Sequence, residues 1–309
     1  MIDEGLARAS DTLLFAAVIA YVVAMFGYFV ELSFGRLAPR PIAGGAVDTV
    51  PAPVAAAVAA PSRVPRLAGR VAVVATVVGL LLHVASAVTR GLAVDRVPWG
   101  NMYEFSSMVS LFAVVAWLGV IRRHPLRHLG GFVMLPVILY LGVAALVLYA
   151  PAAPLVPALN SYWIKIHVVG AMASSGIFMV GFVAAALYLW RSWRDRRAPD
   201  KPSRLPSAAT LDRVSYRVHA FGFPVWTFTV MAGAVWAEAA WGRYWGWDPK
   251  ETWSFVTWVV YAGYLHARST AGWRGRRAAW IAVAGFASLM VTYYVVNIWV
   301  SGLHSYAGV

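Results

Sequence analysis

The residues of this chain best suited to hold a metal or a metal macrocycle are its seven histidines. His167 follows Asn160-Ser-Tyr-Trp-Ile-Lys-Ile at the start of a long apolar run, and His304 stands in the terminal Gly-Leu-His-Ser. Imidazoles on opposite faces of a flat metal macrocycle serve as its axial ligands. The chain has no cysteine, so thiolate metal sites, thiol catalysis and disulfides are excluded.

A tryptophan-rich segment, residues 236–253, is the second chemical feature. It carries five Trp in 18 residues, with glycines between them. Aromatic faces stack on a flat conjugated ligand, and glycines let the backbone approach it closely. Arg243 and Lys250 would pair with carboxylates at the edge of such a ligand, for example the two propionates of a porphyrin. We therefore predict a ligand platform built from Trp241, Trp245, Trp247 and Trp253.

The same segment also has an ordinary structural interpretation. Trp residues gather at membrane interfaces as aromatic belts. Asp248 occupies the position of a helix N-cap, Pro249 that of the first helical residue, and Glu251 that of the reciprocal capping-box partner. From the residues alone, a belt and a ligand platform are equally favoured, and helix capping is the favoured explanation of both acidic residues.

Composition shows that these residues belong to a membrane protein. Of the 309 residues, 61% are hydrophobic and 13% are charged, whereas soluble domains carry roughly 45–50% and about 25%. Apolar runs of about 20 residues, the length that crosses a bilayer, recur along the chain. We predict an all-α, polytopic membrane helix bundle that forms a single integral membrane domain with about eight transmembrane helices. The predicted spans are residues 13–35, 71–90, 103–121, 132–150, 166–190, 219–240, 252–268 and 279–301.

Basic residues orient this bundle. Most of the 26 Lys and Arg fall in alternate loops, namely residues 36–70, 122–128, 191–217 and 268–277. The positive-inside rule makes these loops cytoplasmic, and it places both termini and the segment 241–253 on the outer face. This orientation, together with anionic lipid headgroups, explains the net charge of +13 without nucleic acid. Residues 38–66, rich in Ala and Pro, are predicted to form a cytoplasmic linker.

The other histidines divide between the membrane and the cytoplasmic side. His83 and His266 fall within predicted spans, where a polar side chain is costly and a functional role is the default hypothesis. They would form a second, buried macrocycle site or part of a transfer path, but helix packing explains each equally well. His124, His128 and His219 are better explained by structure. The outer segment 97–105, which contains Glu104, would form either a wall of the site or an interfacial turn.

The tryptophan-rich segment resembles the WWD signature of the haem-handling protein superfamily. Its ending, Asp248-Pro-Lys-Glu-Thr-Trp253, is typical of the CcsA/ResC family of System II cytochrome c biogenesis, whose members are called CcsB in some actinobacteria. The resemblance covers most of the chain, because it also includes Asn101-Met-Tyr-Glu104, His167, His266 and the final Gly-Leu-His304-Ser. The order and spacing of these parts identify the chain as a member of that family.

The resemblance implies a haem-handling subunit of a cytochrome c synthase, with haem b as substrate and ligand. His167 and His304 would be the axial ligands of the iron at the WWD segment, to which Asp248 and the platform residues belong. His266 would belong to an earlier haem site within the membrane, and His83 is a secondary candidate there. The implied partners are a ResB-type membrane protein, with which the synthase activity would be shared, and an apocytochrome with a Cys-x-x-Cys-His motif. The expected location is the bacterial plasma membrane, or the thylakoid membrane of a plastid.

Three alternatives remain open at this point. A CcmC-type haem delivery protein shares a WWD segment and two outer histidines but makes no thioether bond. Small-solute transporters often carry broken helices and charged residues near the membrane midplane. Here Glu31, Glu104 and Glu238 fall near the ends of the predicted spans, which argues against ion-coupled transport. A b-type electron-transfer cytochrome would need histidine pairs at membrane depth, which His83 and His266 alone would supply.

Overall fold

The structure, a computed structural model, describes residues 2–35, 63–154, 161–270 and 272–304, and within them it contains helices but no strands. The predicted fold class, an all-α polytopic membrane bundle, is therefore confirmed. The helices are α1 (Glu4–Phe34), α2 (Arg63–Ala93), α3 (Met102–Arg123), α4 (Gly130–Leu146), α5 (Tyr162–Arg197), α6 (Ala208–Trp241), α7 (Pro249–Ser269), α8 (Arg276–Met290) and α9 (Val296–Trp299). A short 3-10 turn, Arg127–Leu129, precedes α4, and a π-helical turn, Val291–Val295, joins α8 to α9.

Seven helical segments of the described chain are long and apolar enough to cross a membrane, the last of them being the continuous run Arg276–Trp299. α7, which contains the shortest predicted span, 252–268, is not one of the seven. Several helices run past the predicted apolar limits, because capped or charged residues continue them into the polar region. α1, for example, begins after its N-cap Asp3. The linker predicted at 38–66 lies largely outside the described residues, and its last residues, from Arg63, belong to α2.

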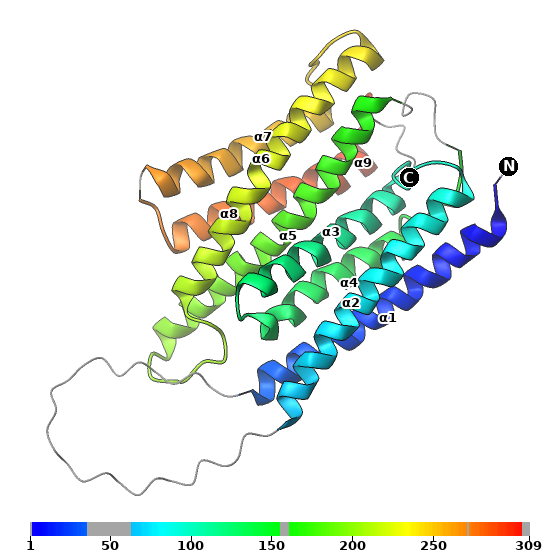
Figure 1. The fold of residues 1–309 in the computed structure, drawn as a ribbon. Coiled ribbons are helices and arrows are strands. Elements are labelled where there is room, and N and C mark those ends of the chain that lie inside the picture. Colours follow the sequence, from blue (N-terminus) through cyan, green and yellow to red (C-terminus); the bar gives the residue numbers. More distant parts are fainter. Residues whose placement is uncertain (1, 36–62, 155–160, 271, 305–309) are drawn as a thin grey trace, which may run out of the picture.

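The helices pack as an up-and-down bundle in which α1 lies along α2 and α5 lies along α6 (Figure 1). The α2–α3 connection, the start of α5, the α6–α7 connection and the end of α9 all reach the same end of the bundle (Figure 1). The basic segment 191–217 and the described residues of the basic segment 268–277 lie at the other end. The alternation of basic and non-basic loops along the sequence is therefore also a separation in space.

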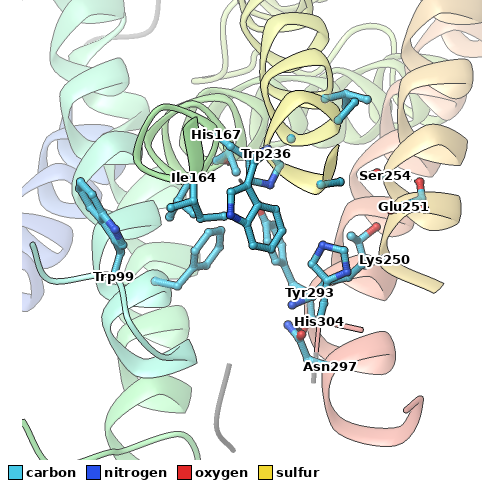
Figure 2. A pocket seen from close by; sticks show the side chains of 18 of the residues that line it. Trp99, Ile164, His167, Trp236, Lys250, Glu251, Ser254, Tyr293, Asn297 and His304 are labelled. Carbon is cyan, nitrogen blue, oxygen red and sulfur yellow. Dashed lines mark hydrogen bonds between the residues drawn. The ribbon is translucent and has the colours of Figure 1, made fainter. Parts of the chain in front are cut away.

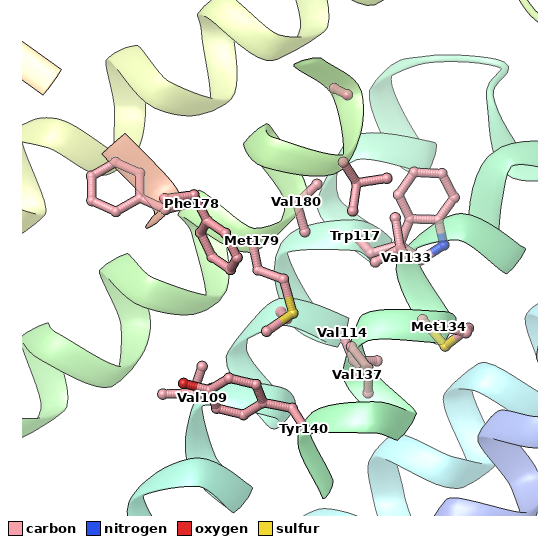
Figure 3. Packing of buried hydrophobic residues seen from close by; sticks show 14 of the residues in the cluster. Val109, Val114, Trp117, Val133, Met134, Val137, Tyr140, Phe178, Met179 and Val180 are labelled. Carbon is pink, nitrogen blue, oxygen red and sulfur yellow. The ribbon is translucent and has the colours of Figure 1, made fainter. Parts of the chain in front are cut away.

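The centre of the bundle is a set of interlocking side chains from α3, α4 and α5 (Figure 3). Trp117 from α3, Met134 and Val137 from α4, and Phe178 and Met179 from α5 are buried there. Burying large apolar groups against each other at close-packed density leaves these helices little freedom to slide. The start of α5 is thus held at a fixed position relative to α3.

The connection between α6 and α7 shows the predicted capping box. α6 ends at Trp241, and its C-cap Gly242 has a φ of 70°, a left-handed conformation that glycine adopts without strain. Asp248 is the N-cap of α7, Pro249 begins the helix, and the Glu251 carboxylate accepts the backbone N–H of Asp248 at 3.0 Å. The helix-capping interpretation of this segment is confirmed. The end of α6 and the start of α7 are both fixed by these caps, so the Trp-rich residues between them form a short connection.

Candidate functional site

A single cavity joins residues from distant parts of the sequence at the end of the bundle where α5 begins (Figure 2). It contains about 1040 Å³ of empty space, part of it open to solvent. Its walls come from the α2–α3 loop with the start of α3, the start of α5, the second half of α6 and the segment 244–254. The π-helical turn, α9 and His304 complete the lining. We call it the histidine cavity. Its lining includes Trp99, His167, Trp236, Trp245, Lys250 and His304.

His167 projects from α5 and is oriented by the neighbouring helix α6. Its Nδ1 lies 2.8 Å from the carbonyl oxygen of Thr229, which can only accept a hydrogen bond, so Nδ1 carries the proton. Gly233, one turn further along α6, makes room for the ring, because a Cβ there would lie 2.6 Å from the imidazole. A metal at this histidine would therefore bind through Nε2.

His304 is oriented by a carboxylate. Its Nδ1 donates to Asp248 Oδ2 at 2.7 Å, and the other oxygen of Asp248 accepts the backbone N–H of Leu303 at 2.6 Å. Burial would raise the pKa of Asp248, but the hydrogen bonds from His304 and Leu303 hold that pKa below its ordinary value of 3.8. Asp248 is consequently ionised at neutral pH, and it directs the Nε2 side of His304 toward any metal.

Trp236 is a site residue that the sequence analysis did not single out. It is 1% exposed, lines the histidine cavity and contacts the ring of His304 at a centroid distance of 6.0 Å. In Figure 2 its indole lies between the two labelled histidines. The helical spacing of Thr229, Gly233 and Trp236 puts all three on one face of α6, which is the signal that would have found them.

The four predicted platform tryptophans do not form one surface. Trp245 lines the cavity. Trp241 does not line it but packs against His304, and the centroids of the Trp241 and His304 rings are 4.9 Å apart. Trp247, at φ 59°, is 66% exposed, and Trp253 is 37% exposed; neither lines the cavity. The guanidinium of Arg243 lies over the backbone of Gly246 rather than in the cavity. Their contact with a ligand remains a prediction.

The two candidate membrane histidines also lie outside the histidine cavity. His83 is fully buried, with Ser107 Oγ 2.8 Å from Nε2 and Tyr21 Oη 3.3 Å from Nδ1. These contacts between α1, α2 and α3 satisfy both ring nitrogens, as the helix-packing interpretation requires. His266 lies toward the other end of α7 on its exposed surface. A haem site at either residue remains a prediction.

The π-helical turn in the last long helix supplies a wall that the sequence did not reveal. Thr292 and Tyr293 of this turn, and Asn297 beyond it, line the histidine cavity. A π-turn adds a residue to one turn of the helix and is frequent at functional sites. Tyr293 is held in place by a 2.6 Å hydrogen bond with Ser175 of α5. No residue type in this stretch signals the π-turn.

Comparison with known proteins settles the family. The sequence profile of the cytochrome c assembly proteins matches residues 99–304. Over 287 residues the chain is 35% identical to the cytochrome c biogenesis protein CcsA of Gloeobacter violaceus, covering 75% of this chain and 85% of that protein. It is 39% identical over 265 residues to the CcsA of Gloeothece citriformis, covering 68% and 79%. The chain belongs to the CcsA family.

CcsA family membership places the chain in cytochrome c biogenesis and confirms the resemblance found in its sequence. The profile match begins at Trp99 and ends at His304, so it includes every residue that lines the histidine cavity. A solved structure of the cytochrome c haem lyase CcmF superposes with a TM-score of 0.60 and 15% sequence identity. The superposition covers 94% of this chain and 46% of CcmF, so the two proteins share a fold over about half of the larger one.

Proposed function

We propose that the histidine cavity binds haem b at the outer face of the membrane and presents it for attachment to an apocytochrome with a Cys-x-x-Cys-His motif. One observation carries this proposal. His167 and His304 are 137 positions apart in the sequence, yet they line the same cavity. Each has its Nδ1 held by a protein acceptor. Iron-ligating histidines are commonly oriented in this way, with Nε2 as the metal ligand.

The remainder of the cavity suits a flat, anionic macrocycle. Trp236, Trp245 and Ile164 supply apolar surface for its faces. Lys250 supplies a cation for a propionate, and the buried Nε1–H of Trp99 has no hydrogen-bond partner among the described residues. Ligand pockets typically combine such an apolar lining with a few placed polar groups.

The attachment reaction requires positioning more than acid–base chemistry. Each cysteine sulfur of the apocytochrome forms a bond to a haem vinyl group, and the thiol proton is taken up by the other vinyl carbon, so no oxidant or reductant is consumed. Residues that hold the iron and fix the vinyl edge accelerate such a step through proximity. The chain's lack of cysteine fits this role, because a thiol here would compete with the thiols of the substrate.

His266 supports a second step of the proposal. It is exposed on α7 within the predicted span 252–268, where an uncovered imidazole would be costly in lipid. We expect a helix of a ResB-type partner to cover this face and complete the earlier haem site there. Haem would then pass from His266 to the histidine cavity.

The full chain, co-expressed with its partner and purified, tests the proposed function. We expect a reduced-minus-oxidised absorption spectrum with the bands of a bis-imidazole haem, and thioether-linked haem when a Cys-x-x-Cys-His apocytochrome is supplied. Haem without any thioether product would favour the CcmC-type delivery protein. Absence of haem from every preparation would contradict the proposal and favour the transporter.

Lys250 should make ligand binding depend on pH. This residue lies on the first turn of α7, and burial lowers its pKa to about 8, against a raising effect of Asp248. Its ammonium is present below that pH and lost above it, so affinity for a porphyrin with two free propionates should fall as the pH rises through about 8. Fluorescence titration with metal-free protoporphyrin measures this, with the dimethyl ester and Lys250→Gln as controls that lack the pH dependence. A wild-type profile as flat as that of Lys250→Gln would count against this role.

A further inference from the structure

We propose that Glu104, Arg90 and Arg96 form a buried ionic clamp that fixes the α2–α3 loop as a wall of the histidine cavity. Glu104 would then be a positioning residue for the ligand, acting through the loop without touching the ligand itself. The proposal rests on the proposed function for the identity of the ligand, haem, but not for the geometry of the wall.

The carboxylate of Glu104 is the centre of the clamp. Its Oε1 accepts from Arg90 Nε at 2.8 Å and from Arg96 Nη2 at 3.0 Å. Its Oε2 accepts from Arg96 Nη1 at 2.7 Å and from the backbone N–H of Gly100 at 2.7 Å. Four donors on one carboxylate satisfy it fully, and the hydrogen bonds that involve both charges are the strong kind.

The clamp is inaccessible to water. The side chain of Glu104 is 0% exposed, and those of Arg90 and Arg96 are 5% and 8% exposed. A second carboxylate, that of the 36% exposed Asp11, lies 3.5 Å from Arg90 Nη1 at the edge of the clamp, so two guanidiniums face two carboxylates. Removing one charge from such a buried group leaves another uncompensated, which is costly. The arrangement therefore resists loss of the Glu104 charge.

The clamp reaches the cavity through the loop that it holds. Asn101 caps α3 by accepting the backbone N–H of Glu104 at 2.9 Å, and Gly100 binds the carboxylate. Trp99, Gly100, Asn101 and Met102 all line the cavity, whereas none of the three charged clamp residues does. A Cβ at residue 100 would lie 2.9 Å from the guanidinium of Arg96, so a larger residue there would shift that guanidinium.

The clamp also ties this wall to a neighbouring segment. Arg90 Nη2 donates to the carbonyl of Ala150 at 2.6 Å, and Arg96 Nε donates to that of Ala153 at 2.8 Å. These residues follow α4. The loop is thereby fixed to α2, to the start of α3 and to the chain after α4, which leaves the indole of Trp99 a defined place in the cavity wall.

Three variants of the full chain with its partner separate positioning from general stability. Glu104→Gln removes the charge that pairs both arginines, and Glu104→Gln with Arg96→Gln restores the charge balance without restoring the clamp. Gly100→Ala displaces Arg96 while keeping every charge. The readouts are haem affinity, thermal unfolding and the labelling rate of a single thiol introduced by Ala234→Cys on the α6 wall of the cavity, since the wild-type chain has no cysteine.

The clamp predicts a specific combination of results. The double variant should unfold near the wild-type temperature, yet bind haem about tenfold more weakly and label roughly tenfold faster, as expected for a displaced wall. Gly100→Ala should show the same two changes. If Glu104→Gln does not fold, the double variant and Gly100→Ala still test the proposal. Wild-type affinity and labelling rate in both of them would overturn the proposal.

A matched control comes from the opposite end of the bundle. Glu31→Gln breaks the ion pair with Arg127, whose atoms lie 2.6 Å apart, and should leave haem affinity and labelling unchanged. The labelling measurement needs no haem. If the wild type binds no haem, the proposed function fails, but faster labelling in the clamp variants would still establish the positioning role of Glu104.

Discussion

His167→Ala combined with His304→Ala should remove the bis-imidazole haem spectrum of the purified protein and lower its haem affinity by at least about 100-fold. Both rings line the same cavity, and each has its Nδ1 fixed by a protein acceptor. Loss of both rings removes the two proposed iron ligands, while the apolar walls remain. The single variants should each give a five-coordinate or mixed-ligand haem spectrum. Reduced-minus-oxidised absorption spectroscopy measures these changes.

Rescue and control variants make this prediction specific. Imidazole added to His304→Gly should restore the six-coordinate spectrum, because the small molecule can take the place of the side chain. His124→Ala, at the opposite end of the bundle, should leave the spectrum unchanged. A spectrum that survives the double substitution but disappears with His266→Ala would contradict the prediction and place the resting haem within the membrane.

Asp248→Asn should weaken haem binding by about 10–100-fold while leaving the start of α7 intact. Asp248 accepts the Leu303 N–H with one oxygen, and the His304 Nδ1–H and Lys250 N–H with the other. An asparagine has one oxygen in place of these two, so it can still cap the helix but cannot satisfy both sides. Equilibrium haem titration measures the affinity, and circular dichroism follows the helix content.

The conservative nature of this substitution allows a matched control. Asp3 is the N-cap of α1 and accepts two backbone N–H groups without touching a histidine, so Asp3→Asn should leave haem affinity unchanged.

Because the pKa of Asp248 is lowered in the fold, its contribution to stability is present above its unfolded pKa of 3.8 and is lost as the pH falls through the folded value. Equal acid sensitivity in wild type and Asp248→Asn would show that this carboxylate does not hold His304.

Asp248 has two structural roles: it caps α7, and it accepts a hydrogen bond from His304. From the sequence alone, helix capping and a part in the ligand site are competing explanations of the segment that follows Trp247. In the structure the capping geometry orients the carboxylate, and the same carboxylate binds the histidine. The N-terminus of α7 therefore supports His304, the proposed iron ligand.

Much of the fold could be predicted because its cause is local. A bilayer-long apolar run specifies a helix by itself, and Asp248-Pro249 with Glu251 specifies where α7 begins. The grouping of His167, Trp245, Lys250 and His304 followed from the alternation of loops across the bundle. Trp236 and Tyr293 were not found, because their place in the cavity depends on how α6 and the π-turn rotate against α5.

The sequence by itself determined that this is a helical membrane protein, which family it resembles and which histidines could hold an iron, since hydropathy and motif order are written along the chain. Tertiary structure decided which of those residues share a cavity. His83 became a packed residue between Tyr21 and Ser107, and Glu104 became the centre of a buried clamp. Such outcomes depend on distances between helices, which pairwise packing sets and no single segment encodes.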